Sequence, residues 1–498
     1  MALESWLLKV KTAISNGIET VRTREGRKGN VGVLAFEIAG LMSKLLQLWH
    51  SLSDRRVLWI RHEAIALEGV RKIVSNDDAF LLALACAEIS ESLRHVAAAV
   101  ARIGSRCDHP ALRSFDRLFR EFADSGKDPH SWVATRKEMD SGAAKKMSRY
   151  VATAARLHKE IDEMAETEQS IRKLLLYNCG AEGDRHHESP IRIKKISDLQ
   201  QKLFWQRQEV RRLKENSLWN RSFDPVVLLM ARSVFTVLAR LKLVFGIRHG
   251  HENPVVLPRS LSATVFPSEN SAANFFSGGP LFRNGSEEID NGGGGGDDAG
   301  GEGEGEGSGE GEGFLVSNRK LLRPPATTLG WAALAQHYAS LIIVMEKMIR
   351  SPHLIGVDAR DDLYGMLPAR LREALRARLR GVGPRAADPA LAAEWREALT
   401  RILDWLAPLA HNMIKWQSER SFEQQSLALR RSATTATAGA NNNNVLLLQT
   451  LFFANQDKTE AAITELLVGL NYIWRFEREM NAMALIACTE FKGSSYNR

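Results

Sequence analysis

A histidine and three carboxylates form the group of side chains with the clearest chemical potential. His353 is followed by Asp358, Asp361 and Asp362. Such a group could transfer protons or bind Ca²⁺ or Mg²⁺. The spacing of a calcium loop is absent, however, and acids at the start of a helix commonly cap it and stabilise its dipole. We interpret the acids as helix-capping residues first, and as a candidate partner contact together with His353.

Two other motifs resemble sites of known chemistry but lack essential residues. The tract 292–313 is nearly all Gly, Glu and Asp, and its glutamates would repel the phosphate that a Gly-rich loop binds. His186 and His187 follow Cys179 without an evident fourth metal ligand. No GxSxG, HExxH or kinase signature occurs. The sequence therefore predicts no catalytic residue, no metal site and no cofactor.

Basic residues near the N-terminus suggest contact with an anionic membrane. A helix over residues 3–15 would place its apolar side chains on one face, and a basic loop follows it. One such helix binds lipid weakly and needs a second signal. Ala2 occupies the position where N-myristoylation requires glycine, so we expect no myristoylation. The candidate lipid contacts are Trp6, Lys9, Lys11, Arg22, Arg24, Arg27 and Lys28.

A second basic surface follows the helix expected over 193–213. It could bind anionic lipid or nucleic acid, but we favour a solvated face whose bases pair with acids of the preceding helix. Those expected acids are Glu160, Asp162, Glu163 and Glu166. A separate candidate is Ser262, which follows Arg259 in the spacing that basophilic kinases accept. We expect Ser262 to be a phosphorylation site.

Helical periodicity dominates the elements that must position these residues. Apolar residues recur at steps of three and four from Leu157 to Leu175 and from Ile193 to Leu213, with a Gly- and Pro-containing connector between them. This pattern predicts an antiparallel helical hairpin; a dimerising coiled coil is the alternative. N-caps are expected at Ser53 or Asp54 for a helix over 55–74, at Asp77 or Asp78 for one over 79–103, and at Asp224 for one over 224–247.

Charge divides the 498 residues into two basic bodies and an acidic connector. Residues 1–250 contain 42 basic and 30 acidic residues, residues 251–322 contain 4 and 12, and the remainder contains 21 and 17. The connector has too little apolar surface to fold. We therefore expect an all-α protein with an N-terminal amphipathic segment over 1–30, helical domains over 31–248 and 323–486, a disordered linker over 249–322 and a tail over 487–498.

The expected compartment is intracellular. The four cysteines (Cys86, Cys107, Cys179 and Cys488) are widely spaced and form no CxxC pair, which favours a reducing environment. The most apolar long segment, 327–345, contains polar residues and is predicted to be a buried helix. We expect the cytoplasm or nucleus, with peripheral contact at the plasma membrane as an option, and no binding to nucleic acid.

Several long segments resemble a known plant family. VGVLAFEIAGLMSKLLQLWHSLSD (31–54) and the segment 68–116 resemble its N-terminal domain, and segments 324–380, 394–425 and 444–477 resemble its C-terminal domain. Together they are similar to the PSK (phytosulfokine) simulator family, whose paired domains have no known molecular function. The resemblance implies a growth-promoting protein linked to peptide-hormone signalling, without an enzymatic activity. Some members carry a myristoylated glycine, from which this chain departs at Ala2.

Three functions follow as hypotheses. The first is a noncatalytic signalling or scaffold protein whose helical domains bind other proteins. The second is a peripheral membrane or trafficking adaptor that uses the basic N-terminal segment. The third is an enzyme built around His353, Asp358 and Asp361. The sequence does not specify the partner, the oligomeric state or whether the two helical domains pack together.

Overall fold

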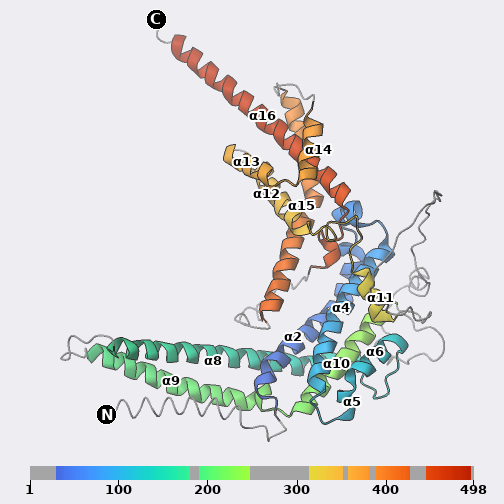
Figure 1. The fold of residues 1–498 in the computed structure, drawn as a ribbon, viewed down its shortest axis with the longest axis vertical. Helices are drawn as coiled ribbons and strands as arrows, with labels where there is room; N and C mark the ends of the chain where they lie inside the picture. Colours follow the sequence, from blue (N-terminus) through green and yellow to red (C-terminus); the bar gives the residue numbers. More distant parts are fainter. Residues whose placement is uncertain are drawn as a thin grey trace, which may run out of the picture.

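The described part of the protein consists of helices and their connections. We analysed a computed structural model, which describes residues 30–179, 190–246, 313–351, 357–380, 388–426 and 445–494. Over these residues there is no β-strand, and only the isolated bridges Asn30↔Ser222 and Thr328↔Asn455 occur. The expected all-α fold is confirmed. The helices form two bodies, each with a hydrophobic core, as Figure 1 shows.

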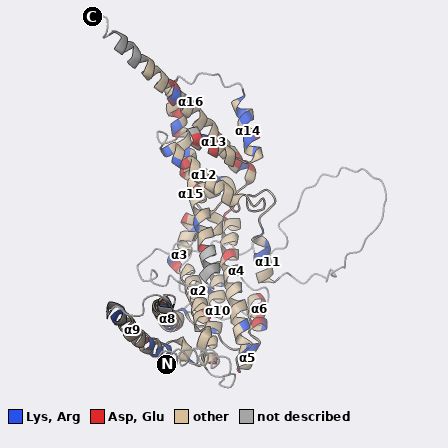
Figure 2. Ribbon diagram, turned by 60° about the vertical axis from the view of Figure 1, so that its left-hand side comes forward, with Lys and Arg blue, Asp and Glu red and all other residues tan. Residues whose placement is uncertain are grey.

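Three long apolar helices build the N-terminal body. They are α2 (Ala35–Ser51), α4 (Asp78–Gly104) and α10 (Phe223–Val244), which pack against one another. These helices carry few charged residues in Figure 2, as expected for helices that are covered on several sides. The short helices α5 (Pro110–Arg113) and α6 (Phe115–Ser125) close one end, where Phe115, Phe119 and Phe122 contact Phe235 of α10.

The predicted start of α4 is confirmed, whereas two other expectations in this body are wrong. Asp77 accepts a hydrogen bond from the Ala79 amide at 2.9 Å. The expected helix 55–74 is instead broken into α3 (Asp54–Trp59) and two π-helical turns, η2 (Ile60–Ala64) and η3 (Val70–Val74). The second error concerns Asp224, which we expected from its position to cap α10. It accepts hydrogen bonds from the amides of Asp108 and His109, both at 3.1 Å.

The predicted hairpin consists of α8 (Ala144–Cys179) and α9 (Pro190–Asn216), which pair along their length. Leu157, Val210 and Leu213 are buried between them. The first half of α8 also packs on α2, so the hairpin projects from the N-terminal body (Figure 1). The preceding turn contains α7 (Arg136–Glu138) and η4 (Met139–Ala143), and η5 (Leu218–Asn220) follows α9.

Three long helices dominate the C-terminal body. α12 (Ala335–Arg350) packs on α15 (Pro389–Ser426), which also packs on α16 (Gln456–Ser494). α13 (Val357–Met366) and α14 (Ala369–Leu379) flank them. Lys and Arg residues gather on α14 in Figure 2. Before α16, the chain forms a short loop that contains η8 (Leu447–Gln449).

The boundaries around the expected linker and the next helix differ from the prediction. α11 (Phe314–Leu321) occupies the last residues of the expected linker and packs on α4 and α6, because its apolar face covers them. α12 begins at Ala335 instead of near Thr328. The chain from Thr328 to Leu334 is held as a turn: the Leu329 amide donates to Ala454 O at 2.9 Å, and Ala333 has a positive φ of 56°.

Among the described helices, one segment, Gly32–Ser51, is long and apolar enough to cross a membrane by length and composition. It contains α2, whose buried residues include Ile38, Met42 and Leu45. These side chains lie in the N-terminal core, so the apolar composition of α2 is explained by packing. The segment 327–345, which the sequence marked as most apolar, is part turn and part α12.

Candidate functional site

The predicted acidic group does not form an assembled site. Asp358, Asp361 and Asp362 all lie on α13, and their side chains are exposed. Asp358 is in the first turn, where it can stabilise the helix dipole. His353 lies outside the described residues, as do Ser262 and all seven candidate lipid contacts between Trp6 and Lys28. Among the described residues there is no cluster of His, Cys, Asp and Glu that could hold a metal ion.

The basic face of α9 is partly neutralised by ion pairs across the hairpin. Arg207 lies 2.9 Å from Glu168, and Arg156 of α8 lies 2.9 Å from Glu209. The acids that we expected as partners differ from these. Asp162 pairs with His158, and Glu163 pairs with Lys159, each within α8. Steps of four along one helix favoured these local pairs.

The hairpin also exposes two aromatic side chains that were not among the residues expected to be functional. Phe204 is 55% exposed and Trp205 is 63% exposed, and their rings meet edge to face. They lie on the side of α9 away from its buried Gln206, Val210 and Leu213. The sequence signal that could have revealed this pair is two adjacent aromatic residues at positions outside the apolar seam of α9.

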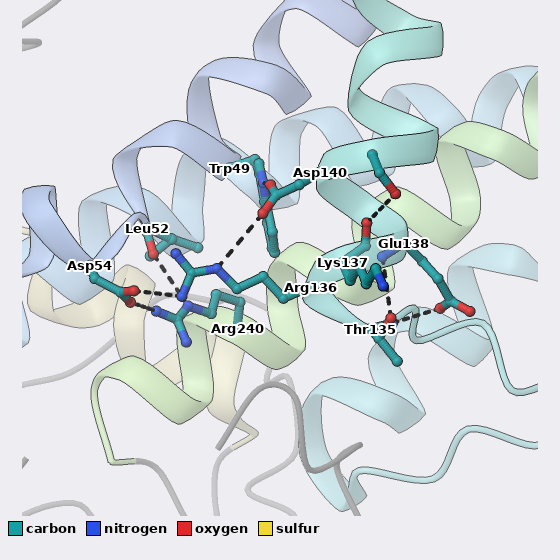
Figure 3. A network of polar contacts seen from close by, with 10 residues as sticks. Trp49, Leu52, Asp54, Thr135, Arg136, Lys137, Glu138, Asp140 and Arg240 are labelled. Atoms are coloured by element: carbon teal, nitrogen blue, oxygen red, sulfur yellow. Dashed lines mark hydrogen bonds and ion pairs between the residues drawn. The ribbon is translucent and has the colours of Figure 1, made fainter. Parts of the chain in front are cut away.

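A polar network around the buried guanidinium of Arg240 fixes the turn that follows α2. Figure 3 shows Arg136 and Arg240 converging on the Asp54 carboxylate, while the Arg240 guanidinium also donates to Leu52 O. Burial would raise the pKa of Asp54, but hydrogen bonds and charge from both arginines outweigh burial and lower it. The Trp49 indole donates to Asp140 at 2.6 Å. The polar groups of this network satisfy one another, so we assign the network a structural role.

The most extensive arrangement lies where the two bodies meet, at a loop over residues 445–455 that we name the junction loop. Leu446, Leu447, Leu448 and Phe453 of this loop belong to the core of the N-terminal body. Leu451 and Ala454 belong to the core of the C-terminal body. The same short segment therefore fills both cores, and we expect the bodies to be coupled through it.

Glu88 on α4 holds the junction loop with its carboxylate. One oxygen accepts from the Leu447 amide at 2.7 Å, and the other accepts from the Trp416 indole of α15 at 3.1 Å. Burial raises the pKa of Glu88, although these hydrogen bonds and the nearby Arg420 oppose the effect. A single side chain of the N-terminal body thus binds two separate elements of the C-terminal body.

A second contact of the junction involves residues 69–73, most of which belong to η3. Ile73 lies in the core of the C-terminal body, and its carbonyl accepts from the Asn455 amide at 2.7 Å. A Cβ atom added at Gly69 would overlap the Trp405 carbonyl oxygen of α15. Lys72 lies over the Trp405 ring, 4.9 Å from its centroid. The absence of a side chain at Gly69 therefore permits the close approach of α15.

The helix α11 is anchored beside this junction by a buried amine. Lys242 of α10 donates to the carbonyls of Phe122 and Ala123 at the end of α6, and it lies 5.0 Å from the Phe314 ring centroid. Burial lowers the pKa of Lys242 to about 8. The Phe314 amide donates to Asp124 at 2.9 Å. These contacts fix the point where the chain enters the C-terminal half.

An open cleft of about 360 Å³ lies at the junction between α4, α11, α15 and the junction loop. A neighbouring hollow of about 370 Å³ shares Trp416, Arg420 and Phe452 with it. The surface between the bodies is therefore hollowed, and both bodies contribute to its walls. The cleft is lined by Glu88, Glu91, His95, Arg319, Leu322, Arg323, Trp416, Arg420, Leu447 and Phe452.

The cleft contains two glutamates, Glu88 and Glu91. Its carboxylates are engaged: Glu88 as described, and Glu91 by two hydrogen bonds from Arg94 at 2.7 Å. No nucleophile paired with a base is among the lining residues. The sequence did not reveal this site, because its residues are dispersed from Glu88 to Phe452 and only tertiary packing assembles them.

Two family models match this chain, one in each body. A domain of unknown function, DUF3475, matches residues 33–89, and a protein family of unknown function, DUF668, matches residues 328–415. The first region contains Gly69, Ile73 and Glu88, and the second contains Trp405. The junction therefore joins the two matched regions directly.

Curated relatives are similar to this chain over most of its length. Protein PSK SIMULATOR 1 of Arabidopsis thaliana is 25% identical over 473 residues, which cover 92% of this chain and 58% of that protein. The chain resembles the PSK simulator proteins over most of its length. PSK SIMULATOR 3 of the same plant is 24% identical over 90% of this chain and 56% of the relative. The chain thus spans somewhat more than half the length of these PSK simulators. No solved structure matches it significantly.

Proposed function

We propose that this protein is a noncatalytic signalling or scaffold protein that promotes plant growth in phytosulfokine-type signalling. Its relatives carry the name PSK SIMULATOR, which supports the growth role. The observation that supports a scaffold is the junction: Glu88 and the junction loop hold two helical bodies together and leave an open cleft between them. Other proteins are the proposed partners.

Growth complementation tests this proposal against the catalytic alternative. Plants that lack the protein would receive wild type, a Glu88→Ala variant or a His353→Ala/Asp361→Asn variant. We expect growth to be restored by wild type and by the double variant, because the scaffold role needs no proton transfer. We expect Glu88→Ala to restore less growth. Loss of growth with a stably folded double variant would contradict the noncatalytic role.

Peripheral membrane binding is the second candidate, and the exposed aromatic pair on α9 favours it. Phe204 and Trp205 could enter the lipid interface, where Trp is favourable, while Lys202 and Arg211 are exposed nearby on α9. Such contact would supply the second signal that the N-terminal basic segment needs.

Liposome flotation tests the second candidate. We expect salt-sensitive flotation with vesicles that contain phosphatidylserine and weaker flotation for Phe204→Ser/Trp205→Ser. Trp331→Ser is a matched control, because Trp331 is 65% exposed on the C-terminal body. Flotation that is absent, or that both variants reduce equally, would reject the hairpin as a lipid contact.

A further inference from the structure

Arginines from both bodies gather around the interdomain cleft. Arg319 lies on α11, Arg323 follows that helix, and Arg420 lies on α15. All three are exposed. Among the described residues none of them forms an ion pair with a carboxylate. The positive charge of these three side chains is therefore available to a ligand.

The acids of the cleft do not cancel this charge. Glu91 is bound by the neighbouring Arg94, and its pKa is lowered by that hydrogen bond and by further positive charge that includes Arg319. Glu88 accepts hydrogen bonds from both bodies. His95, which is 65% exposed, adds a further group that can donate. The cleft is thus an electropositive hollow with its acids already engaged.

The arginine geometry suits a compact oxyanion. The Arg420 guanidinium lies over the Trp416 ring, 4.2 Å from its centroid, which restrains its plane. A guanidinium offers a planar fork of donors that can bind a phosphate group through two parallel hydrogen bonds. A cleft of about 360 Å³ accommodates a phosphorylated side chain.

We propose that this cleft binds the phosphate-monoester group of a phosphorylated protein partner, with Arg319, Arg323 and Arg420 as its ligands. The inference deepens and rests on the proposed partner-binding role. Because α11 packs on the N-terminal body and α15 belongs to the C-terminal body, a bound phosphate bridges the two bodies. Phosphorylation of the partner would therefore control both its binding and the tightness of the junction.

The test follows the Trp416 indole N–H resonance by NMR in the full chain. The indole donates to Glu88 on the wall of the cleft. The probes are inorganic phosphate and O-phospho-L-serine at constant ionic strength, with L-serine as the neutral counterpart. We expect saturable shifts with both phosphate probes and none with L-serine. A soluble phosphoinositide headgroup, compared under the same conditions, distinguishes a lipid source: tighter binding than O-phospho-L-serine would overturn a protein partner as the ligand's source.

Variants make the result specific to the cleft. Arg319→Ala/Arg323→Ala should weaken binding of O-phospho-L-serine by at least tenfold, whereas Arg117→Ala on α6 removes an exposed arginine outside the cleft and should leave it unchanged. Wild type that shows no saturable shift, or equal weakening by both variants, would overturn the proposal. If the phosphate probes do not bind but wild type restores growth in the complementation assay, the phosphate proposal fails and the proposed scaffold function stands.

Discussion

Two buried ionisable side chains make contacts that fix how the helices of this protein pack. Glu88 and Lys242 both lie in helices whose apolar periodicity the sequence shows clearly, so α4 and α10 could be predicted. Their roles could not, because the partner atoms belong to residues far away in the chain. Spacing within a helix carries no information about such contacts. The same reason explains why Asp224 was misassigned as a cap.

Removing the Glu88 carboxylate should weaken the junction. In Glu88→Ala the Leu447 amide and the Trp416 indole lose their acceptor, and each buried donor left unpaired costs about 1–3 kcal/mol. We expect a lower free energy of unfolding in urea titrations. Glu63→Ala, an exposed glutamate on η2, is the control and should change stability little. Equal effects of the two variants would contradict the assigned role.

Lys242 should make stability depend on pH in the alkaline range. Its pKa is about 8 in the folded protein and 10.5 ordinarily. Between these values the unfolded chain binds more protons, so stability should rise as pH rises through this window, by up to about 1.4 kcal/mol per pH unit. The Lys242→Met variant lacks this pH-dependent contribution to stability. In urea unfolding from pH 8 to pH 10, the free energy of unfolding of wild type should rise relative to that of Lys242→Met. A difference that stays constant with pH would contradict this role of Lys242.

Helix packing decides which elements the sequence could predict. The hairpin was predictable because its two apolar seams face each other, and Leu157, Val210 and Leu213 are buried as the seams require. The interruption between α3 and η3 was not predictable. Apolar spacing continues through 55–74, and it carries no sign of the close contact that Gly69 makes with α15 in the folded chain.

A glycine in α16 should show how closely α15 and α16 pack. A Cβ atom at Gly469 would lie 2.5 Å from the Trp395 ring and 2.9 Å from a Leu399 methyl group. Gly469→Ala should therefore destabilise the protein, although alanine favours helices by about 1 kcal/mol over glycine. Gly40→Ala in α2 has no atom within 4 Å of the added Cβ and should stabilise. Thermal unfolding of both variants, compared with wild type, tests whether the two substitutions change stability in opposite directions.

At the scale of the whole molecule, the junction unites two regions that separate family models match. The sequence predicted two helical bodies and left open whether they pack together. The junction loop answers that question, because Leu447 lies in one core and Leu451 in the other. The cleft with its arginines exists only in this arrangement, which is why no linear motif marks it.

The central claim is that the junction loop locks the two bodies together. Hydrogen exchange of residues 446–455, measured by mass spectrometry in wild type and in Gly69→Ala, tests it most directly. The added methyl group would overlap the Trp405 carbonyl and force α15 away. We predict slow exchange in wild type, faster exchange of 446–455 and 69–74 in Gly69→Ala, and unchanged exchange in α8, with Gly40→Ala behaving as wild type. Fast exchange of 446–455 in wild type, or no response to Gly69→Ala, would contradict the account.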